Sequence, residues 1–206
     1  KGNEGGLIQD AHKKGAGLCE VSEKVFNKIA YGDRQEGLIA VARQPKLSLS
    51  ELKLRANSLL VVLEHIEKPG NLGAIIRSAD AAGADAVIAA DAASDIYNPN
   101  VVRSSIGAIF AIPVVKAKSE RLILWLKARK IKIICACVEQ GLAYTSVDFS
   151  GASAIILGSE EKGLSMPWKE SADFQVSIPM AGSADSLNVS VAAGILLFEA
   201  VRQRRG

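Results

Sequence analysis

The sequence lacks the features that mark membrane, secreted and disordered proteins. None of its apolar runs approaches the roughly 20 residues of a membrane helix, and no basic-then-apolar signal segment opens it, so we expect a reduced, cytoplasmic protein. Its three cysteines, Cys19, Cys135 and Cys137, have neither C-x-x-C spacing nor a neighbouring histidine, which excludes a zinc site of the usual pattern. A hydrophobic fraction of 49% with 23% charged residues excludes intrinsic disorder.

The fingerprints of common nucleotide-binding and hydrolase folds are missing as well. The early glycines lack the third glycine of a dinucleotide motif. Gly158 and Gly163 have the spacing of a P-loop, but Leu164 stands where the phosphate-binding lysine is required. There is no G-x-S-x-G elbow, and neither His12 nor His65 has a supporting pattern. We therefore interpret His65 as structural.

From residue 59 onward the sequence has a regular alternation. Short apolar runs alternate with longer segments of helical period, which is typical of a parallel sheet covered by helices on both faces. The predicted strands span residues 59–63, 86–90, 112–115, 131–138, 154–157 and 174–178. The predicted helices span residues 72–82, 99–106, 120–129 and 186–205. The pattern therefore predicts an α/β domain with six parallel strands over residues 57–206.

Residues 1–56 have a different character. They are more polar and predict a helix at 23–30, a strand at 37–42 and a loop at 43–50. One helix and one or two strands cannot bury a core of their own. We expect this segment to be either the tail of a small α/β domain or an arm packed on the main domain.

Three segments place polar side chains where a predicted strand has just ended. After the first strand, Asn71 stands near a helix start and Arg77 lies nearly two turns into an apolar helix. Taken alone, Asn71 is explained as a helix cap and Arg77 as a solvated charge.

The second and third segments follow later strands. Gly158 and Gly163 bracket a loop at the carboxyl end of a strand, where open α/β sheets bind ligands. Ser186 and Asn188 stand at the start of the last helix, and Ser186 alone is explained as its cap.

In this order, the three segments resemble the signature motifs of the SpoU/TrmH branch of the SPOUT methyltransferases. Residues 71–77 read N-x-G-x-x-x-R, residues 157–164 read L-G-S-E-x-x-G-L, and residues 178–190 read I-P-M-x-G-x-x-x-S-L-N-V-S. Residues 98–108 also resemble the family's stretch before its middle strand. The resemblance covers residues 59–206.

The resemblance implies both a fold and an activity. Members of this family transfer a methyl group from S-adenosylmethionine to a ribose 2′-hydroxyl in RNA. They act as homodimers whose active sites borrow residues across the interface. Their parallel α/β sheet ends in a C-terminal deep trefoil knot, which no periodicity predicts.

Carried over motif by motif, the resemblance also assigns site residues. The cofactor pocket is expected to involve Leu157, Gly158, Ile178, Met180, Leu187 and Val189. The reaction centre is expected to involve Asn71, Arg77, Glu160, Ser186 and Asn188. RNA contacts are expected from Lys68, Arg77, Arg103 and Lys162. No metal is expected, and Lys68 stands where family members often have Asp.

The chemistry limits what these residues do. A methyl sulfonium is already a strong electrophile, so the protein has to position the hydroxyl and help to remove its proton. A guanidinium stays protonated, so we expect Arg77 to hold the phosphate beside the target ribose and to stabilise developing alkoxide charge. Glu160 orients either a catalytic group or the cofactor, and the sequence leaves both roles open.

The choice of RNA depends on the N-terminal segment. Residues 21–30 and 35–41 resemble the end of the small substrate-binding domain of members that modify ribosomal RNA, which favours 23S ribosomal RNA. Two alternatives stay open: a transfer RNA 2′-O-methyltransferase, and a non-catalytic RNA-binding module that has lost turnover. The net charge of +3 is small for an RNA-binding protein, so we expect the RNA contacts to be local.

Overall fold

The chain forms two compact units, Lys1–Arg43 and Gln44–Gly206. The computed structural model describes residues 4–32, 37–93, 95–138 and 141–205. Within these residues no helix is both long enough and apolar enough to cross a membrane.

The first unit contains two helices, α1 (Glu4–Lys13) and α2 (Glu23–Ile29). The helix predicted at 23–30 is thus confirmed, whereas α1 was not predicted. The strand predicted at 37–42 is wrong: these residues are extended, but no described strand pairs with their backbone groups. None of the side chains described in this unit is buried, so it has no core of its own. Gln35 and Glu36, which carry part of the N-terminal resemblance, lie outside the described residues.

The second unit is built on a seven-stranded sheet in which every strand pair is parallel. The strands are β1 (Leu59–Glu64), β2 (Ala86–Ala90), β3 (Val114–Ala117), β4 (Lys132–Ala136), β5 (Leu142–Ala143), β6 (Ser153–Leu157) and β7 (Phe174–Ser177). Their order across the sheet is β3-β2-β1-β6-β4-β7-β5. The six predicted strands are confirmed, and the two-residue β5 is additional.

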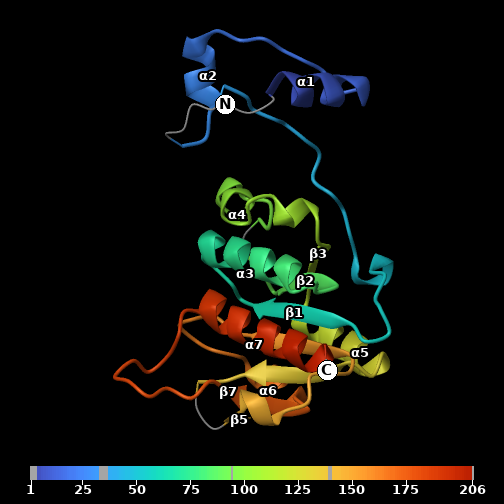
Figure 1. Ribbon diagram of the computed structural model, residues 1–206, viewed down its shortest axis with the longest axis vertical. Coiled ribbons are helices and arrows are strands. Elements are labelled where there is room, and N and C mark those ends of the chain that lie inside the picture. Colours follow the sequence, from blue (N-terminus) through green and yellow to red (C-terminus); the bar gives the residue numbers. More distant parts are fainter. Residues whose placement is uncertain (1–3, 33–36, 94, 139–140, 206) are drawn as a thin grey trace. The chain divides into compact units, whose positions relative to one another are not determined.

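Helices cover both faces of this sheet, as Figure 1 shows. One face carries α3 (Pro69–Ala81), α4 (Pro99–Ser104), η2 (Ala108–Phe110) and α7 (Val189–Arg204). The other carries η1 (Leu49–Glu51), α5 (Ser119–Ala128) and α6 (Met166–Ser171). A short turn, η3 (Tyr144–Ser146), follows β5. The four predicted helices are confirmed, whereas α6 was not predicted.

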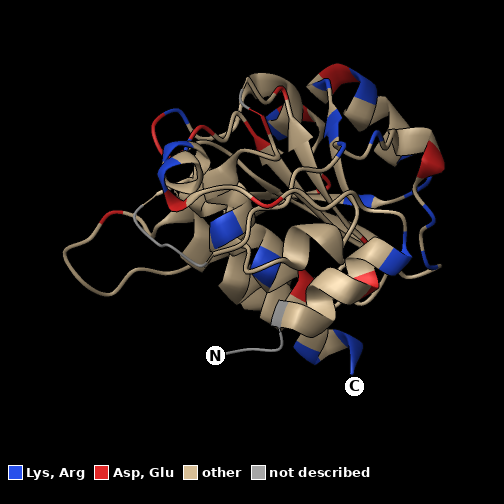
Figure 2. Ribbon diagram, turned by 90° about the horizontal axis from the view of Figure 1, so that it is seen from above, with Lys and Arg blue, Asp and Glu red and all other residues tan. Residues whose placement is uncertain are grey.

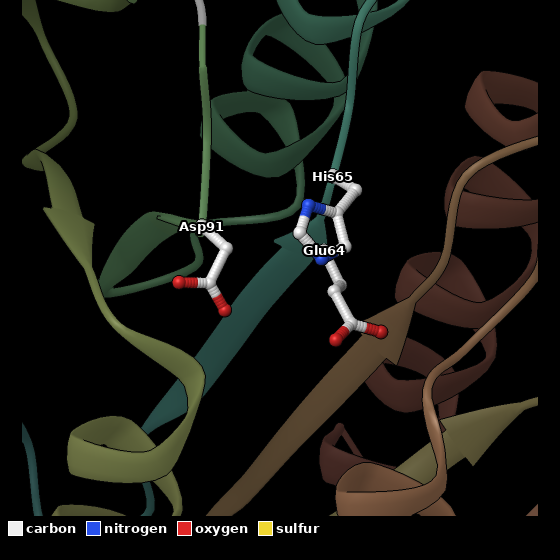
Figure 3. Close-up of side chains that lie close together, drawn as sticks. All are labelled: Glu64, His65 and Asp91. Atoms are coloured by element: carbon white, nitrogen blue, oxygen red, sulfur yellow. The ribbon is translucent and has the colours of Figure 1, made fainter.

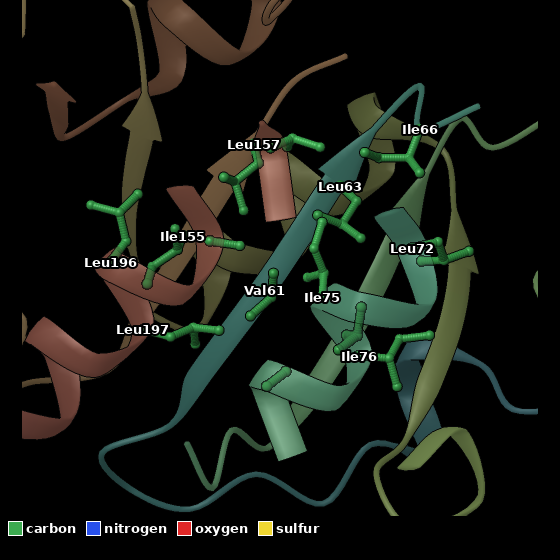
Figure 4. Packing of buried hydrophobic residues seen from close by; sticks show 14 of the residues in the cluster. Val61, Leu63, Ile66, Leu72, Ile75, Ile76, Ile155, Leu157, Leu196 and Leu197 are labelled. Atoms are coloured by element: carbon green, nitrogen blue, oxygen red, sulfur yellow. The ribbon is translucent and has the colours of Figure 1, made fainter. Parts of the chain in front are cut away.

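Burial on both faces explains why the strands read as continuous apolar runs. All six residues of β1 are buried. Leu59, Val61 and Leu63 belong to the cluster under α3 and α7, part of which Figure 4 shows. The alternating Leu60 and Val62 belong to the cluster under α5. Burying each such side chain stabilises the fold by about 1.5–3 kcal/mol, so a polar substitution in β1 is costly on either face.

The segment before β1, residues 44–58, belongs to the second unit. Leu49 in η1 is 5% exposed and lies in the same cluster as β1, and Leu47, Leu52 and Leu54 pack against that cluster. The division between the units therefore falls after Arg43, whereas the sequence placed it after residue 56. Apolar residues spaced along a loop have no period, so their burial was not evident from the pattern.

The order of the strands indicates where a ligand would bind. The chain leaves β1 towards β2 and β3 on one side, and later fills the other side with β4, β6 and β7. Ligands bind at such a change of direction, outside the carboxyl ends of the strands. The three motif segments follow β1, β6 and β7, so all three lie at this edge.

The C-terminal end of α7 is anchored at the opposite edge. The Arg204 guanidinium donates to the carbonyls of Phe149 and Gly151 at 2.9 and 2.6 Å, and to Ser153 Oγ at 2.9 Å. These bonds hold α7 in register with β6, and so position the N-terminus of α7 at the site.

Candidate functional site

The three motif segments meet at the carboxylate of Glu160. It accepts hydrogen bonds from the side-chain amides of Asn71 at 2.9 Å and Asn188 at 2.8 Å, and it forms an ion pair with Lys68. Lys68 and Asn71 come from the start of α3, Glu160 from the loop after β6, and Asn188 from the start of α7. The predicted meeting of Asn71, Glu160 and Asn188 is thus present in the structure.

The surroundings of Glu160 keep it ionised. The ammonium of Lys68 is the largest influence, and with Asn71 and the backbone N–H of Val189 it lowers the pKa of Glu160 below its ordinary value. Val189 is the first residue of α7, where the helix dipole favours a negative charge. At neutral pH Glu160 is therefore an acceptor of hydrogen bonds and a poor acceptor of a proton.

Asn188, rather than Ser186, caps α7. Its side-chain oxygen accepts the backbone N–H of Ser190 at 2.9 Å, and the helix begins at Val189. Asn71 is not a cap either, because α3 begins at Pro69 and Asn71 is its third residue. A proline at the first helical position costs no hydrogen bond, because the N–H that it lacks would have no partner within the helix. The helix α3 therefore begins at Pro69, three residues before the predicted start at residue 72.

A cavity of about 780 Å³ opens beside this cluster. It is lined by all six residues assigned to the cofactor: Leu157, Gly158, Ile178, Met180, Leu187 and Val189. Ser186 and Lys162 line it too. Its volume and its apolar walls with a few polar groups suit a small-molecule cofactor.

The loop after β6 closes one side of the cavity and depends on Gly158. A Cβ at this position would lie 2.2 Å from the carbonyl carbon of Gly163 and 2.5 Å from the backbone nitrogen of Leu164. Gly163 itself has a φ of +64°, which favours glycine. The two glycines let the loop fold tightly back onto the end of β6.

A buried carboxylate at the end of β1 holds the far side of this loop. Glu64 is 1% exposed and accepts hydrogen bonds from Ser165 Oγ at 2.6 Å and from the Ser165 backbone N–H at 2.8 Å. The loop is thus fixed both to the end of β1 and to the cluster around Glu160.

Glu64 also lies near two further titratable groups, His65 and Asp91, as Figure 3 shows. Their potential ligand atoms lie within 4.8 Å of one another. Asp91 accepts the backbone N–H of Ser119 at 3.1 Å and pairs with Lys118 at 3.2 Å. The carboxylates of Glu64 and Asp91 are thus both bound by donors of the protein itself. We therefore interpret the three side chains as a structural link between the ends of β1 and β2 rather than as a metal site.

Two predicted residues stand apart from this cluster. Arg77 is exposed on α3 and does not line the cavity, because residues six apart on a helix point to different sides. Arg103 is exposed on α4. Neither of these two guanidinium groups forms a hydrogen bond or an ion pair within the described part of the chain.

Sequence reasoning missed several residues of the cavity. Cys137 from the end of β4, Lys169 from α6 and Gln175 from β7 line it. The Cys137 thiol hydrogen-bonds Gln175 Oε1 at 3.6 Å. These residues lie outside the three motifs, and no local pattern marks them, because the strand order alone brings β7 beside β4.

The fold and site define an α/β protein with a ligand cavity at the carboxyl edge of a parallel sheet. The sequence model of the SpoU rRNA Methylase family matches residues 58–198, and the chain belongs to this family. Members of the family use S-adenosylmethionine.

Curated relatives and solved structures agree with this family. The chain is 40% identical over 182 residues to a 23S rRNA (uridine(2479)-2′-O)-methyltransferase of Streptomyces viridochromogenes, covering 84% of this chain and 63% of that protein. It is 38% identical over 203 residues to a 23S rRNA (guanosine-2′-O-)-methyltransferase, RlmB, of Ralstonia nicotianae, covering 96% and 82%. The AdoMet-bound rRNA methyltransferase of Sinorhizobium meliloti superposes with a TM-score of 0.90 at 32% identity, covering 97% of this chain and 77% of that one.

Proposed function

We propose that this chain carries the catalytic domain of an enzyme that methylates a ribose 2′-hydroxyl in 23S ribosomal RNA with S-adenosylmethionine. The observation that carries the proposal is the Glu160 cluster at the edge of a cavity lined by all six residues assigned to the cofactor. The names of the relatives support the substrate, since both act on 23S rRNA at a 2′-oxygen.

Both the side chains and the backbone groups that line the cavity fit the cofactor. Leu157, Ile178 and Leu187 supply apolar walls for an adenine ring, and the glycine at position 158 brings backbone polar groups close to it. When bound, S-adenosylmethionine supplies an electrophilic methyl group. The residues of this chain then have to orient the ribose hydroxyl and accommodate its proton.

We assign Glu160 a positioning role. A carboxylate with a lowered pKa that already binds Lys68, Asn71 and Asn188 is poorly suited to remove a proton near neutral pH. It is well suited to hold the two asparagine side chains in one arrangement. Their amides then present fixed polar groups at the rim of the cavity.

Arg77 supports a second part of the proposal, that the enzyme works as a homodimer. Arg77 lies on α3, which packs between α4 and α7 in one helical layer. The same layer exposes large apolar side chains that a monomer rarely leaves in water. They are Ile106 at 69%, Phe110 at 67% and Phe198 at 51% exposure. A second copy packed on this layer would cover them and receive Arg77 at its own site.

Three further properties stay predictions. Threading of the last segment into a trefoil knot is expected from the family. Residues 1–56 are proposed to include the end of an RNA substrate-binding domain. A cytoplasmic location is expected for a protein that acts on ribosomal RNA.

Methylation of RNA fractions tests the activity. Purified protein, labelled S-adenosylmethionine and separated ribosomal and transfer RNA are incubated, and the labelled nucleotide is mapped. We expect label at one ribose of 23S rRNA. Label in transfer RNA alone would support the transfer RNA alternative, and calorimetry without cofactor binding would support a non-catalytic module.

The oligomeric state is tested separately, by light scattering on the wild type and on Phe198→Asp. We expect a dimer that the substitution converts to a folded monomer with intact cofactor binding and little methyl transfer. A wild type that stays monomeric at micromolar concentration contradicts the homodimer.

A further inference from the structure

A second, smaller cavity lies beside the Glu160 cluster. It has a volume of about 280 Å³, and Glu160, Lys162 and Val189 line both this cavity and the cofactor cavity. The two cavities therefore adjoin at the Glu160 cluster. Among the residues that line the smaller cavity alone is His65, which directly follows β1. We name this smaller space the His65 cavity.

His65 is held in place by its backbone. Its N–H donates to the carbonyl of Ala90 at the end of β2 at 3.1 Å, and its φ of +51° lies in the left-handed region. The carboxylates of Glu64 and Asp91 lie beside the ring, as Figure 3 shows, but other donors of the protein bind them. Within the described part of the chain the exposed imidazole forms no hydrogen bond or ion pair. The link between β1 and β2 therefore leaves the ring available to a ligand in the cavity.

The charged groups of the His65 cavity do not favour an anion. Among the described residues that line it, Glu67, Glu160 and Glu161 carry carboxylates, and Lys68 and Lys162 carry ammonium groups. Lys68 is already paired with Glu160. Figure 2 shows acidic and basic residues adjoining in other loops too. A flat, neutral group that makes polar contacts at its edge suits this lining better than a phosphate does.

The chemistry of the reaction brings the base of the target nucleotide close to this cavity. The ribose hydroxyl attacks the methyl group in line, from the side opposite to the sulfur of the cofactor. The nucleotide therefore lies at the Glu160 cluster but outside the cofactor cavity. Its base is attached to C1′, the ribose carbon next to the one that carries the 2′-hydroxyl. A nucleotide in position to react thus has its base within a few ångströms of the cluster, where the His65 cavity opens.

We propose that the His65 cavity receives the base of the target nucleotide and that the imidazole of His65 stacks on this base. The inference rests on the proposed function, since it requires an RNA ribose at the Glu160 cluster. Among the described residues that line the cavity, His65 carries the aromatic ring. Proteins bind the unpaired bases of single-stranded RNA by stacking them on aromatic side chains, histidine included. Because every base has a flat face, this contact holds the nucleotide without selecting its identity.

A double-mutant cycle between His65 and the target base tests the proposal. The wild type and His65→Gly are each titrated with a 23S rRNA fragment that contains the mapped nucleotide, and with the same fragment lacking the base of that nucleotide. S-adenosylhomocysteine is present, so that no methyl group is transferred. Glycine suits the left-handed φ, so the substitution removes the ring without backbone strain.

We expect the two fragments to respond differently to the loss of the ring. His65→Gly weakens binding of the intact fragment about 5- to 150-fold, the range that corresponds to the loss of one stacked base. It weakens binding of the base-free fragment less than about 2-fold, as for two groups with no shared contact. His65→Asn keeps a polar side chain but loses the ring, so it behaves like His65→Gly.

Lys130→Gly is the matched control. Lys130 is also exposed and has a left-handed φ, of +55°, but it lines neither the cofactor cavity nor the His65 cavity. We expect Lys130→Gly to change the binding of both fragments by the same factor. Steady-state kinetics distinguish substrate binding from a structural role, because His65→Gly raises KM for RNA and saturating RNA restores turnover. Calorimetry with S-adenosylmethionine and urea unfolding give wild-type values for His65→Gly.

The outcomes separate this inference from the proposed function. Equal losses on the two fragments, or no loss on either, overturn the inference, because His65 then does not contact the target base. Wild-type affinity of His65→Asn for the intact fragment also overturns it, since a polar contact then replaces stacking. If the wild type methylates the fragment and the cycle shows no coupling, the inference fails alone. If the wild type neither binds nor methylates RNA, the proposed function fails and the inference fails with it.

Discussion

The side-chain amide of Asn188 donates a 2.8 Å hydrogen bond to the carboxylate of Glu160. Asn188 caps α7 and Glu160 lies in the loop after β6, so this bond joins the last helix to the loop beside the cofactor cavity. Asn71 on α3 donates to the same carboxylate and also accepts from Asn188 at 3.3 Å. Each of the three side chains restrains the other two, which is how a site holds its geometry before substrate arrives.

Replacing Glu160 with Gln tests this restraint. The amide keeps the shape but loses the charge that binds Lys68, and its NH2 group faces the donors of Asn71 and Asn188. We expect kcat for methyl transfer to fall about 100-fold, since small misplacements in a positioned site have effects of that order. Steady-state kinetics with RNA measure the change. Glu170→Gln, in an exposed position on α6, is the control, and wild-type turnover by Glu160→Gln would contradict the positioning role.

Arg77→Lys tests whether Arg77 acts as a two-pronged phosphate contact. Lysine keeps the charge but loses the planar fork, so we expect turnover on RNA to fall about 10- to 100-fold with cofactor affinity unchanged. Single-turnover kinetics and calorimetry measure the two quantities, with Arg205→Lys as the control. Near-full turnover with lysine shows that the fork is not needed. A group that titrates near neutral pH in the wild type and vanishes in the variant would instead make Arg77 the base.

Gly158→Ala tests the tight fold of the loop after β6. The new Cβ would lie within 2.5 Å of three backbone atoms of Gly163 and Leu164, so the loop has to move away from the strand end. We expect cofactor affinity to fall at least 10-fold and stability to drop by about 1–3 kcal/mol. Calorimetry and thermal unfolding measure these effects. Gly151→Ala is the control. Gly151 lies just before β6, at the other end of the strand, and a Cβ there would have Lys132 Nζ as its neighbour, at 3.9 Å. We expect this variant to bind cofactor and unfold like the wild type.

The lowered pKa of Asp85 leads to a prediction of how the free energy of unfolding depends on pH. Burial raises its pKa, but hydrogen bonds from Arg55 and from the backbone N–H of Leu59 outweigh burial and leave the pKa below its ordinary value. The stability that this ionised carboxylate contributes is therefore present at neutral pH and is lost as the pH falls below about 4. Asp85→Asn is expected to lower the free energy of unfolding by about 2–3 kcal/mol at neutral pH and to flatten its fall in acid.

Urea unfolding across this pH range measures both effects of Asp85→Asn. Asp80→Asn, on the exposed side of α3, is the matched control. An unchanged acid dependence in Asp85→Asn would show that other carboxylates control acid unfolding.

Much of the fold was predictable because the burial of an element determines the pattern of its apolar residues. β1 and β2 are buried at every position, so both sides of the sheet had to be apolar and the strands read as continuous runs. The sequence also showed that each motif segment follows a predicted strand, and the parallel strand order then places all three segments at one edge of the sheet. β5, with two residues, and α6, with six, are too short for a period to appear.

The sequence by itself determined the α/β class, the six main strands, the family motifs and six of the residues that line the cavity of about 780 Å³. Tertiary structure alone decided which polar groups bind one another. Lys68 and Glu160 are 92 residues apart, and Glu64 and Ser165 are 101 apart. The division after Arg43 and the exposed position of Arg77 were also decided there. The physical reason is that a residue's own neighbours determine which side of an element it occupies, whereas its partners across the sheet depend on strand order and register.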